Sequence, residues 1–390
     1  MRVAIDGSCW ANRRGFGRFT RCLVAEMAAA GRHDYLLVID EASVNDPSLP
    51  PLPGELEVVP VALDAAPAHA AGATSSRSIR DMLRMTRATR QTRAGAVFFP
   101  ATYSYYPVMG APVVVTIHDA IAERLPHLTL PTRADRLRWW VKQQLAVRQA
   151  KQIVTVSEAS RRAIMEEMRV APDRLHVIRE APAPIFAPLA DDERVPLLTR
   201  FGLHRGPPYL LYVGGISPHK NVELLVAAFD LVAADHPQLR LVLVGDTSDD
   251  PFLSSVPAVK NAIAASPAAD RIVMTGFVSD EELVALYGGA AATALPSFAE
   301  GFGLTAAESA ACGAPVVASD DPALRELLGD AGVYGAADDP RAFADAFRRL
   351  LDDPGHRAER SRAASAVAAG WSWEAAADRT ADLLERAAGG

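Results

Sequence analysis

The chain has few cysteines, few lysines and no long apolar run. Its three cysteines, Cys9, Cys22 and Cys312, lack redox or metal-binding spacing, which is typical of a reducing compartment, so we expect a cytoplasmic location. No 18-residue apolar stretch and no charged leader with an apolar core occurs, which argues against a membrane span and against secretion. Only four of the 40 basic residues are lysines, which we attribute to genome composition.

Metal and nucleic-acid signatures are also absent. No two aspartates are separated by one residue and no His/Cys cluster has ligand spacing, so we expect no obligatory cation. The net charge is −7, but residues 1–185 carry +6 and the remainder carries −13. The basic first half favours an anionic partner, although nothing in it matches a nucleic-acid-binding motif.

Length and patterning predict two α/β domains. A chain of 390 residues is too long for one ordinary core. Short apolar strands alternate with helices in both halves, which is typical of doubly wound parallel sheets. We place the domains at 1–183 and 184–373, with a stiff, extended linker at 181–188 (APAPIFAP) and an amphipathic last helix, about 374–390, packing back on the first domain. Such an arrangement predicts a deep cleft with ligands at the carboxyl ends of the strands.

The most informative segment is 296–317, in which Glu300 and Glu308 are separated by seven residues. A loop containing Gly301 and Gly303 runs into a helix predicted from Leu304, and free N–H groups at such a helix start favour an anion. Eight helical residues span up to about 12 Å, wider than the roughly 5–9.5 Å of a glycosidase pair. This spacing favours a nucleotide sugar, with its diphosphate between the two carboxylates, over two merely solvated glutamates.

Other candidate residues follow predicted strands. Gly214 and Gly215 follow the strand at 209–213, and Lys220 at the next helix entry suits a phosphate. Gly17 and Arg18 open the first long helix, where an ordinary tight turn is the alternative to an anion contact. His118 and Asp119 end the strand at 113–117 and favour a functional role. Ser157 follows the strand at 152–156, where a helix N-cap is the simpler interpretation.

Two basic helices raise a membrane alternative. Six arginines at three- and four-residue spacing lie between Arg77 and Arg93, and the helix at 133–150 combines basic residues with Trp139 and Trp140. Such helices can lie on anionic lipid, which would place the protein peripherally at the inner face of the membrane. The alternative is a solvated basic face with both tryptophans in the core.

Taken together, the segments resemble the large retaining glycosyltransferase family 4, which has the GT-B fold of two Rossmann-like domains. The similarity covers nearly the whole chain: IDG and GFGR near the start, VTIHD, VTVSEAS, VGGISPHKN, VLVGD, TGFVSDEEL and the E-x7-E block. It implies a hexosyltransferase, independent of metal, that moves a sugar from a UDP- or GDP-linked donor to a hydroxyl acceptor in polysaccharide, glycolipid or glycoconjugate synthesis.

The resemblance also implies roles for individual residues. Glu308 would bind the donor ribose, Glu300 the donor sugar and Lys220 the diphosphate. The donor would further contact the loops and the helix start at Gly17, Gly214, Gly215, Phe277, Val278, Gly301, Phe302, Gly303 and Leu304. His118 would lie near the transferred sugar, making His118, Glu300 and Lys220 the catalytic set, with Arg18, Asp119 and Ser157 on the acceptor side.

The chain departs from the family pattern at two places. Gly215 stands where relatives often carry an arginine, for which His219 or Arg18 are the candidate substitutes. Glu180-Ala181-Pro182 stands where many relatives have Asn-Gly, which affects acceptor recognition. The missing arginine keeps open a catalytically silent nucleotide-sugar-binding subunit, and the scaffold itself also suits an epimerase or a phosphorylase.

Overall fold

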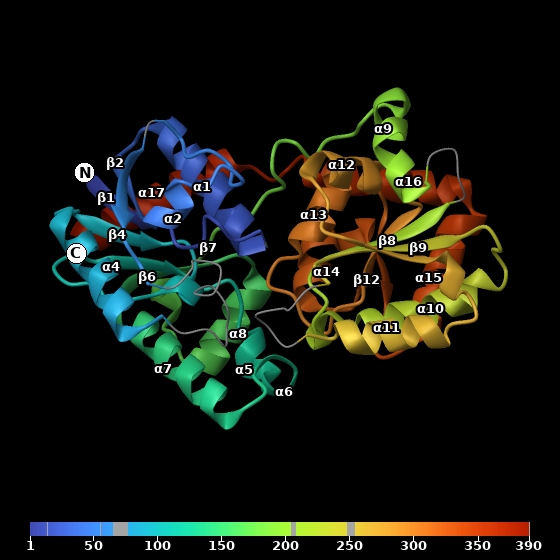
Figure 1. The fold of residues 1–390 in the computed structure, drawn as a ribbon, viewed down its shortest axis with the longest axis horizontal. Helices are drawn as coiled ribbons and strands as arrows, with labels where there is room; N and C mark the ends of the chain where they lie inside the picture. The colour runs from blue at the N-terminus through green and yellow to red at the C-terminus, as the bar shows by residue number, and fades with distance from the viewer. Residues whose placement is uncertain (14, 55, 65–76, 204–207, 248–253, 390) are drawn as a thin grey trace. The chain divides into compact units, whose positions relative to one another are not determined.

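The computed structural model describes residues 1–390 except 14, 55, 65–76, 204–207, 248–253 and 390. The chain forms two compact units, one of Met1–Glu180 with Ser372–Gly390 and one of Ala181–Trp371. Each unit contains one parallel sheet with helices between successive strands (Figure 1). The predicted α/β class with two doubly wound domains is therefore confirmed.

The first unit is built on a seven-stranded sheet in its described residues, with the strand order β3-β2-β1-β4-β5-β6-β7. Its strands are β1 (Arg2–Asp6), β2 (Asp34–Asp40), β3 (Glu57–Val61), β4 (Ala96–Phe99), β5 (Val113–Thr116), β6 (Ala150–Thr155) and β7 (Leu175–Val177). Its α-helices are α1 (Gly15–Ala30), α2 (Glu41–Val44), α4 (Ile79–Gln91), α5 (Ile121–Arg124), α6 (Pro126–Thr129), α7 (Arg133–Gln149), α8 (Glu158–Met168) and α17 (Trp373–Gly389).

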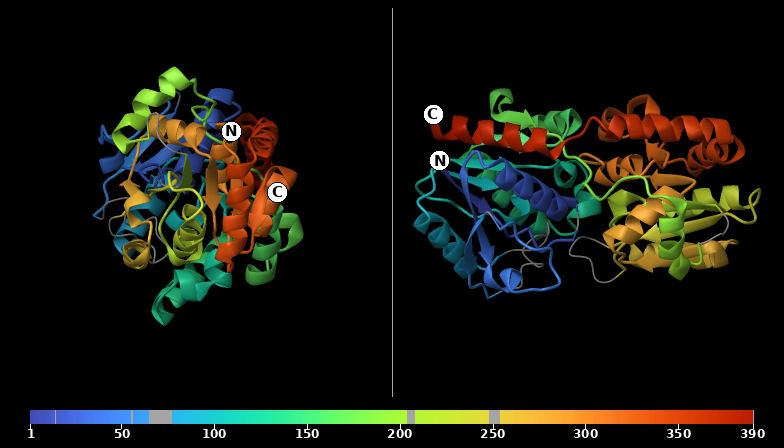
Figure 2. Two further views of the ribbon diagram at one scale, coloured as in Figure 1. Left: turned by 90° about the vertical axis from the view of Figure 1, so that its right-hand side faces the viewer. Right: turned by 90° about the horizontal axis from the view of Figure 1, so that it is seen from above.

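The last helix belongs to the first unit. α17 runs beside α1 (Figure 2) and also touches β4, β5 and β6. Its Trp373 is buried, and the ring lies 5.7 Å from that of Phe19 on α1. The chain therefore leaves the first unit after Glu180 and returns to it at Ser372.

The second unit carries a six-stranded parallel sheet in its described residues, with the order β10-β9-β8-β11-β12-β13. The strands are β8 (Tyr209–Val213), β9 (Arg240–Val244), β10 (Ile272–Gly276), β11 (Ala292–Leu295), β12 (Val316–Ser319) and β13 (Val333–Gly335). The helices are α9 (Asp191–Leu198), α10 (Val222–Ala233), α11 (Val256–Ala265), α12 (Asp280–Gly289), α13 (Leu304–Ala311), α14 (Pro322–Leu328), α15 (Pro340–Asp352) and α16 (Pro354–Ala368).

Local sequence determines where α12 starts. α12 begins with a capping box, in which the Ser279 hydroxyl accepts from the Glu282 N–H and the Glu282 carboxylate accepts from the Ser279 N–H.

The core beneath the helices of the second unit is apolar: Phe229 on α10 and Phe343 on α15 pack with Leu241 of β9. Strand β13 was not predicted from the sequence.

Two sequence expectations need correction, and a third gains detail. The segment 181–188 is not fully extended, since the Phe186 N–H donates to the Ala183 carbonyl and closes a turn. Core burial of both tryptophans holds for Trp139 but is wrong for Trp140, which is 55% exposed. The basic stripe on α4 is partly neutralised, because Arg84 pairs with Asp64 and Asp81.

No helix in the described part of the chain is both long enough and apolar enough to cross a membrane.

In both parallel sheets, the direction in which successive strands are added reverses at one point. The strand order places this switch between β1 and β4 in the first unit and between β8 and β11 in the second. At such points the connections after neighbouring strands leave on opposite faces, and ligands of open α/β sheets bind in the crevice that results.

The glycine turn after β8 depends on close backbone packing. A Cβ on Gly245, which follows β9, would lie 2.3 Å from the Gly214 carbonyl oxygen. Since a real Cβ essentially never comes so near, Gly245 holds the turn against the end of β9.

We expect Gly245→Ala to lower the free energy of unfolding of the second unit by about 1–3 kcal/mol, because the turn must shift to make room. Urea denaturation measures this change. Gly288→Ala in α12 is the matched control, since its Cβ would meet nothing closer than 3.6 Å, and it should be neutral or slightly stabilising. Equal effects of the two substitutions would show that the approach at Gly245 carries no constraint.

Candidate active site

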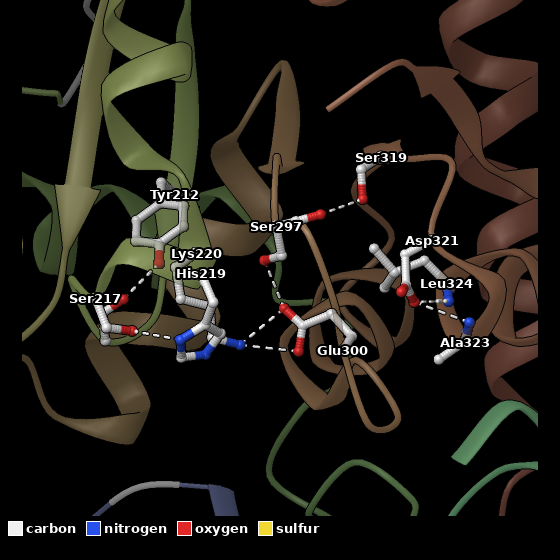
Figure 3. Close-up of polar contacts among 11 residues, drawn as sticks. Tyr212, Ser217, His219, Lys220, Ser297, Glu300, Ser319, Asp321, Ala323 and Leu324 are labelled. Carbon is white, nitrogen blue, oxygen red and sulfur yellow. Dashed lines mark hydrogen bonds and ion pairs between the residues drawn. The ribbon is translucent and has the colours of Figure 1, made fainter. Parts of the chain in front are cut away.

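The centre of the candidate site is an ion pair at the switch point of the second unit. Lys220 ends a 3-10 turn (Pro218–Lys220) after β8, and Glu300 lies in the loop after β11. The Lys220 Nζ lies 2.8 Å from both Glu300 carboxylate oxygens (Figure 3). The two residues, 80 positions apart in sequence, are thus brought together as two motifs of one site.

Serine hydroxyls support the glutamate. The Ser297 Oγ donates to Glu300 Oε1 at 2.6 Å, and the Ser319 Oγ donates to the Ser297 carbonyl at 2.6 Å (Figure 3). Ser297 and Ser319 are each only 1% exposed. The carboxylate is therefore fixed by a buried chain of hydrogen bonds that starts at the end of β12.

The loops after β8 and β11 are also joined through their backbones. The Phe298 N–H donates to the His219 carbonyl at 2.9 Å. The Asn221 Nδ2 donates to the Pro296 carbonyl at 3.1 Å, and Asn221 itself adopts a left-handed φ of 57°. These contacts fix the distance between the lysine-bearing and glutamate-bearing segments.

Burial and charge set the ionisation of this cluster. Burial acts to raise the pKa of Glu300, but the Lys220 charge and the hydrogen bonds from Lys220 and Ser297 outweigh it and lower the pKa below its usual value, with a further contribution from His219. Burial and the Glu300 charge raise the pKa of Asp321 to about 6, against hydrogen bonds from the Ala323, Leu324 and Glu300 N–H groups. Glu300 is therefore a carboxylate near neutral pH.

The second glutamate of the motif lies inside the following helix. Glu308 on α13 is 2% exposed, and the buried Tyr287 hydroxyl lies 3.1 Å from its Oε2. α13 begins after Gly303, whose φ is 95° and whose absent Cβ would lie 2.6 Å from a Leu324 methyl carbon. Only glycine fits here, and the first N–H groups of α13 have no carbonyl one turn earlier.

The remaining residues predicted in this unit differ in their burial and in their contacts. The Gly215 carbonyl accepts from the Tyr212 hydroxyl at 2.7 Å. Phe277 is 55% exposed after β10, whereas the adjacent Val278 is buried. Phe302 is buried and its ring lies 6.2 Å from that of Trp371, so it packs the loop. Gly301 and Leu304 lie in the loop and at the first position of α13.

In the first unit, Gly17 lies in the first turn of α1, where a Cβ would be 1.9 Å from the Asn12 carbonyl oxygen. Arg18 follows it and is partly buried. Asp119 and Ser157 have local roles. Asp119 accepts from the Ile121 N–H at 2.9 Å, and Ser157 is the N-cap of α8, as the simpler interpretation predicted.

His118 follows β5 and is held on both sides of its ring. Its Nδ1 lies 3.2 Å from Glu180 Oε1, and its Nε2 lies 3.0 Å from the Pro100 carbonyl. Burial would lower the pKa of His118, but the hydrogen bond and charge of Glu180 and the Pro100 carbonyl raise it above its usual value. The Phe19 ring on α1 packs edge-on against it at 4.7 Å.

Sequence reasoning missed several supporting residues, namely Ser297, Ser319, Tyr287 and Asp321. Ser297 stands three residues before Glu300 and was detectable from the motif. Ser319, Tyr287 and Asp321 act from other elements and carried no signal. Among the described residues no group of three His, Cys, Asp or Glu side chains is arranged to hold a metal ion.

We expect Lys220→Met to lower the free energy of unfolding by about 3 kcal/mol at neutral pH, because a carboxylate that is 10% exposed would lose its counter-ion. The depressed pKa of Glu300 stabilises the parent above the usual carboxylate range, and this is lost as the pH falls through that pKa. The deficit of the variant should therefore shrink on acidification.

Urea denaturation at about pH 7 and at about pH 3.5, above and below the usual carboxylate pKa, measures this effect. Lys260→Met, at an exposed position of α11, is the control and should change little. Adding Glu300→Gln to Lys220→Met should recover much of the loss, and a deficit that is independent of pH would contradict an electrostatic cause.

Comparisons with known proteins show the family of the chain. Residues 13–180 match the family described as Glycosyltransferase Family 4, and residues 199–367 match Glycosyl transferases group 1. The chain is 30% identical over 273 residues to O-antigen chain mannosyltransferase B of Escherichia coli, covering 69% of each. It is 30% identical over 295 residues to alpha-D-kanosaminyltransferase of Streptomyces kanamyceticus, covering 74% of this chain and 73% of that protein.

A D-inositol 3-phosphate glycosyltransferase of Acidothermus cellulolyticus is 32% identical over 273 residues, which is 68% of this chain and 60% of that protein. Solved structures share the fold. Sucrose-phosphate synthase from Thermosynechococcus elongatus aligns with a TM-score of 0.78 at 20% identity, over 99% of this chain and 98% of that one. Anabaena HepE, solved with UDP and glucose, aligns with a TM-score of 0.74 at 17% identity, over 99% and 100%.

The two halves of the molecule, each with its own parallel sheet, thus match the two halves of one family of sugar-transferring enzymes. The chain belongs to the GT-B glycosyltransferases of family 4 and group 1.

Proposed function

We propose that this glycosyltransferase moves a hexosyl group from a UDP- or GDP-linked sugar to a hydroxyl acceptor with retention of the anomeric configuration, in polysaccharide, glycolipid or other glycoconjugate synthesis. The observation that carries the proposal is the Lys220–Glu300 pair at the switch point of the second unit, with Glu308 eight residues further on. A cation, a carboxylate and an unsatisfied helix start lie where an elongated anionic ligand is bound in this class of sheet.

The donor contacts follow from these positions. Lys220, 24% exposed, is accessible to a diphosphate, and the backbone at Gly214, Gly215 and 301–304 offers close approach. Glu308 is assigned to the ribose hydroxyls and exposed Phe277 with Val278 to the base. In the first unit, the backbone at Gly17 is assigned to the phosphates.

The missing arginine at Gly215 has a candidate substitute. His219 precedes Lys220, its Nδ1 lies 3.3 Å from the Ser217 Oγ, and its charge contributes to lowering the pKa of Glu300. A protonated His219 would therefore supply a second positive charge near the phosphates.

We propose that the acceptor attacks the anomeric carbon from the same face as the departing diphosphate. The acceptor oxygen bonds to the anomeric carbon as the bond between that carbon and the diphosphate oxygen breaks. The departing diphosphate oxygen takes the acceptor proton. Lys220 offsets the charge on the departing diphosphate. Glu300 is a positioning residue for sugar hydroxyls rather than a nucleophile, because Lys220 and Ser297 already engage its oxygens.

No step of this route needs a metal, and the proposal includes metal independence. Lys220, His219 and backbone N–H groups take the place that a divalent cation has beside a diphosphate in metal-dependent transferases. Adding EDTA to the nucleotide-binding experiment tests this part separately.

We expect the matching nucleotide, among UDP, GDP, ADP and dTDP, to raise the Tm of the parent, and EDTA to leave the rise unchanged. Glu308→Ala should weaken that nucleotide and raise the donor KM at least about tenfold, because ribose hydroxyls lose a charged acceptor. Glu326→Ala, an intermediate-exposure position on α14, is the control.

An unchanged donor KM in Glu308→Ala would remove the ribose assignment. Tight nucleotide binding without turnover across many hydroxyl acceptors would favour a silent binding subunit, and donor consumption without acceptor would favour an epimerase or a phosphorylase. The absence of any nucleotide effect would refute the donor class.

We further propose that α7 contacts an anionic membrane surface. Four exposed apolar residues lie on one face of this helix at three- and four-residue spacing: Leu137, Trp140, Val141 and Leu145. Exposed arginines flank them at positions 133, 136, 138 and 148, although Arg138 pairs with Asp135. An apolar stripe bordered by cations fits the headgroup region of anionic lipid.

The parent should therefore sediment with vesicles that contain phosphatidylglycerol and not with neutral ones, and salt should weaken this binding. Replacing Leu137 and Trp140 together by serine should reduce the bound fraction at least about tenfold, since buried apolar area is lost. Leu231→Ser, at an exposed position of α10, is the control. A parent that stays in solution with both vesicle types would rule out the membrane contact.

A further inference from the structure

The buried pair formed by His118 and Glu180 in the first unit has no part in the transfer described above. Their side chains are 10% and 6% exposed, and the Nδ1 to Oε1 distance is 3.2 Å. His118 follows β5, and the Pro100 carbonyl that faces its Nε2 follows β4. The pair therefore lies at the carboxyl edge of the sheet, close to β4, where the strand order changes direction.

The geometry fixes the hydrogen-bonding capacity of the histidine. A carboxylate oxygen and a backbone carbonyl can only accept hydrogen bonds, so both ring nitrogens must carry protons to satisfy them. The imidazolium that results has both N–H groups committed and no lone pair. The raised pKa of His118 agrees with this state. His118 therefore has no remaining site for a sugar hydroxyl.

The Glu180 carboxylate can accept a further hydrogen bond. Its Oε1 faces His118, whereas its Oε2 has no partner in the part of the chain that the structure describes and is not among the oxygens sealed from solvent there. The imidazolium also balances the charge of the carboxylate. An oxygen that is fixed, accessible and already neutralised suits an uncharged O–H donor better than a cation.

We propose that Glu180 binds a sugar hydroxyl through Oε2, and that His118 is the positioning residue that holds its carboxylate. The ligand class is the neutral polyol part of a substrate, either the acceptor or the transferred sugar. This inference rests on the proposed sugar transfer and gives the hydroxyl contact of the first unit to Glu180 instead of His118. No proton moves to Glu180, since the acceptor proton leaves with the diphosphate.

A glutamate at position 180 also limits which sugar hydroxyl can bind there. Glu180 is a carboxylate in a Glu-Ala-Pro segment, and an amide side chain at this position would have different hydrogen-bonding capacity. A carboxylate accepts from a hydroxyl and cannot donate, whereas an asparagine amide can do both. The hydroxyl selected here must therefore act as a donor.

The test compares Glu180→Ala and Glu180→Gln with the parent and with Glu166→Gln, an exposed glutamate on α8 of the same unit. Initial rates are measured with the donor and acceptor pair that the parent uses, and with their monodeoxy analogues. We expect Glu180→Ala to raise the KM of one sugar substrate at least about tenfold, because a hydrogen bond to a charged group is lost. Stabilisation by the free nucleotide should stay unchanged.

One monodeoxy analogue identifies the hydroxyl. It should react poorly with the parent and be indifferent to Glu180→Ala, because the partner of Glu180 is already missing. Whether this analogue is of the acceptor or of the donor tells which substrate is bound. Glu180→Gln should lie between Ala and the parent, since its amide oxygen can still accept, and Glu166→Gln should match the parent.

A second readout does not depend on activity. Ring-nitrogen chemical shifts in the full chain near neutral pH should show His118 protonated at both nitrogens in the parent and at one in Glu180→Ala, with Tm values confirming that each variant folds. A singly protonated His118 in the parent would overturn the geometry. A parent that transfers sugar while Glu180→Ala leaves every KM unchanged would overturn the hydroxyl contact alone, whereas a parent without transfer would refute the proposed function.

Discussion

A buried carboxylate governs the second unit of this enzyme. Glu300 is nine-tenths shielded from water, and a charge in that position is tolerated only with a counter-ion and hydrogen-bond donors around it. Lys220 supplies the counter-ion and Ser297 the donor, and Ser319 in turn fixes Ser297. The four side chains can meet only because the loops after β8 and β11 and the end of β12 lie together at one edge of the sheet.

Parallel strands bring such residues together without long connecting loops. The carboxyl ends of neighbouring strands lie at one edge, so residues about 80 positions apart need only short loops to come together. The same principle operates in the first unit, where Pro100, His118 and Glu180 follow β4, β5 and β7. The second unit pairs a lysine with a carboxylate, and the first pairs an imidazolium with a carboxylate. Each site therefore joins a cation to an anion, but the two differ in which group can still bind a ligand.

The sequence predicted the two α/β domains and nearly all long elements, because buried parallel strands such as Tyr209–Val213 read as short apolar runs between helical periods. It also predicted that Lys220 and the glutamate motif act together. It did not predict that Lys220 binds Glu300 directly, since a spacing of 80 residues contains no information about side-chain direction.

The supporting residues escaped for a related reason. Ser319, Tyr287 and Asp321 contact the site from separate elements, and a buried serine or tyrosine has the same local sequence signature whether or not it holds a glutamate. His118 was predicted as functional from its place at a strand end, but its partners Glu180 and Pro100 decide its ionisation and became visible only in three dimensions.

In the proposed transfer, the ion pair also explains how an empty site and a filled one can both be electrostatically satisfied. Without donor, Lys220 and Glu300 neutralise each other, so neither charge lies unpaired in a partly buried position. A diphosphate drawn to Lys220 weakens the hold of that lysine on Glu300, and the carboxylate then needs new hydrogen-bond donors. The hydroxyls of the attached sugar are the nearest source of such donors, since sugar and diphosphate are one molecule. A free nucleotide would bring the phosphate without the hydroxyls, so the pair favours the intact donor over its product.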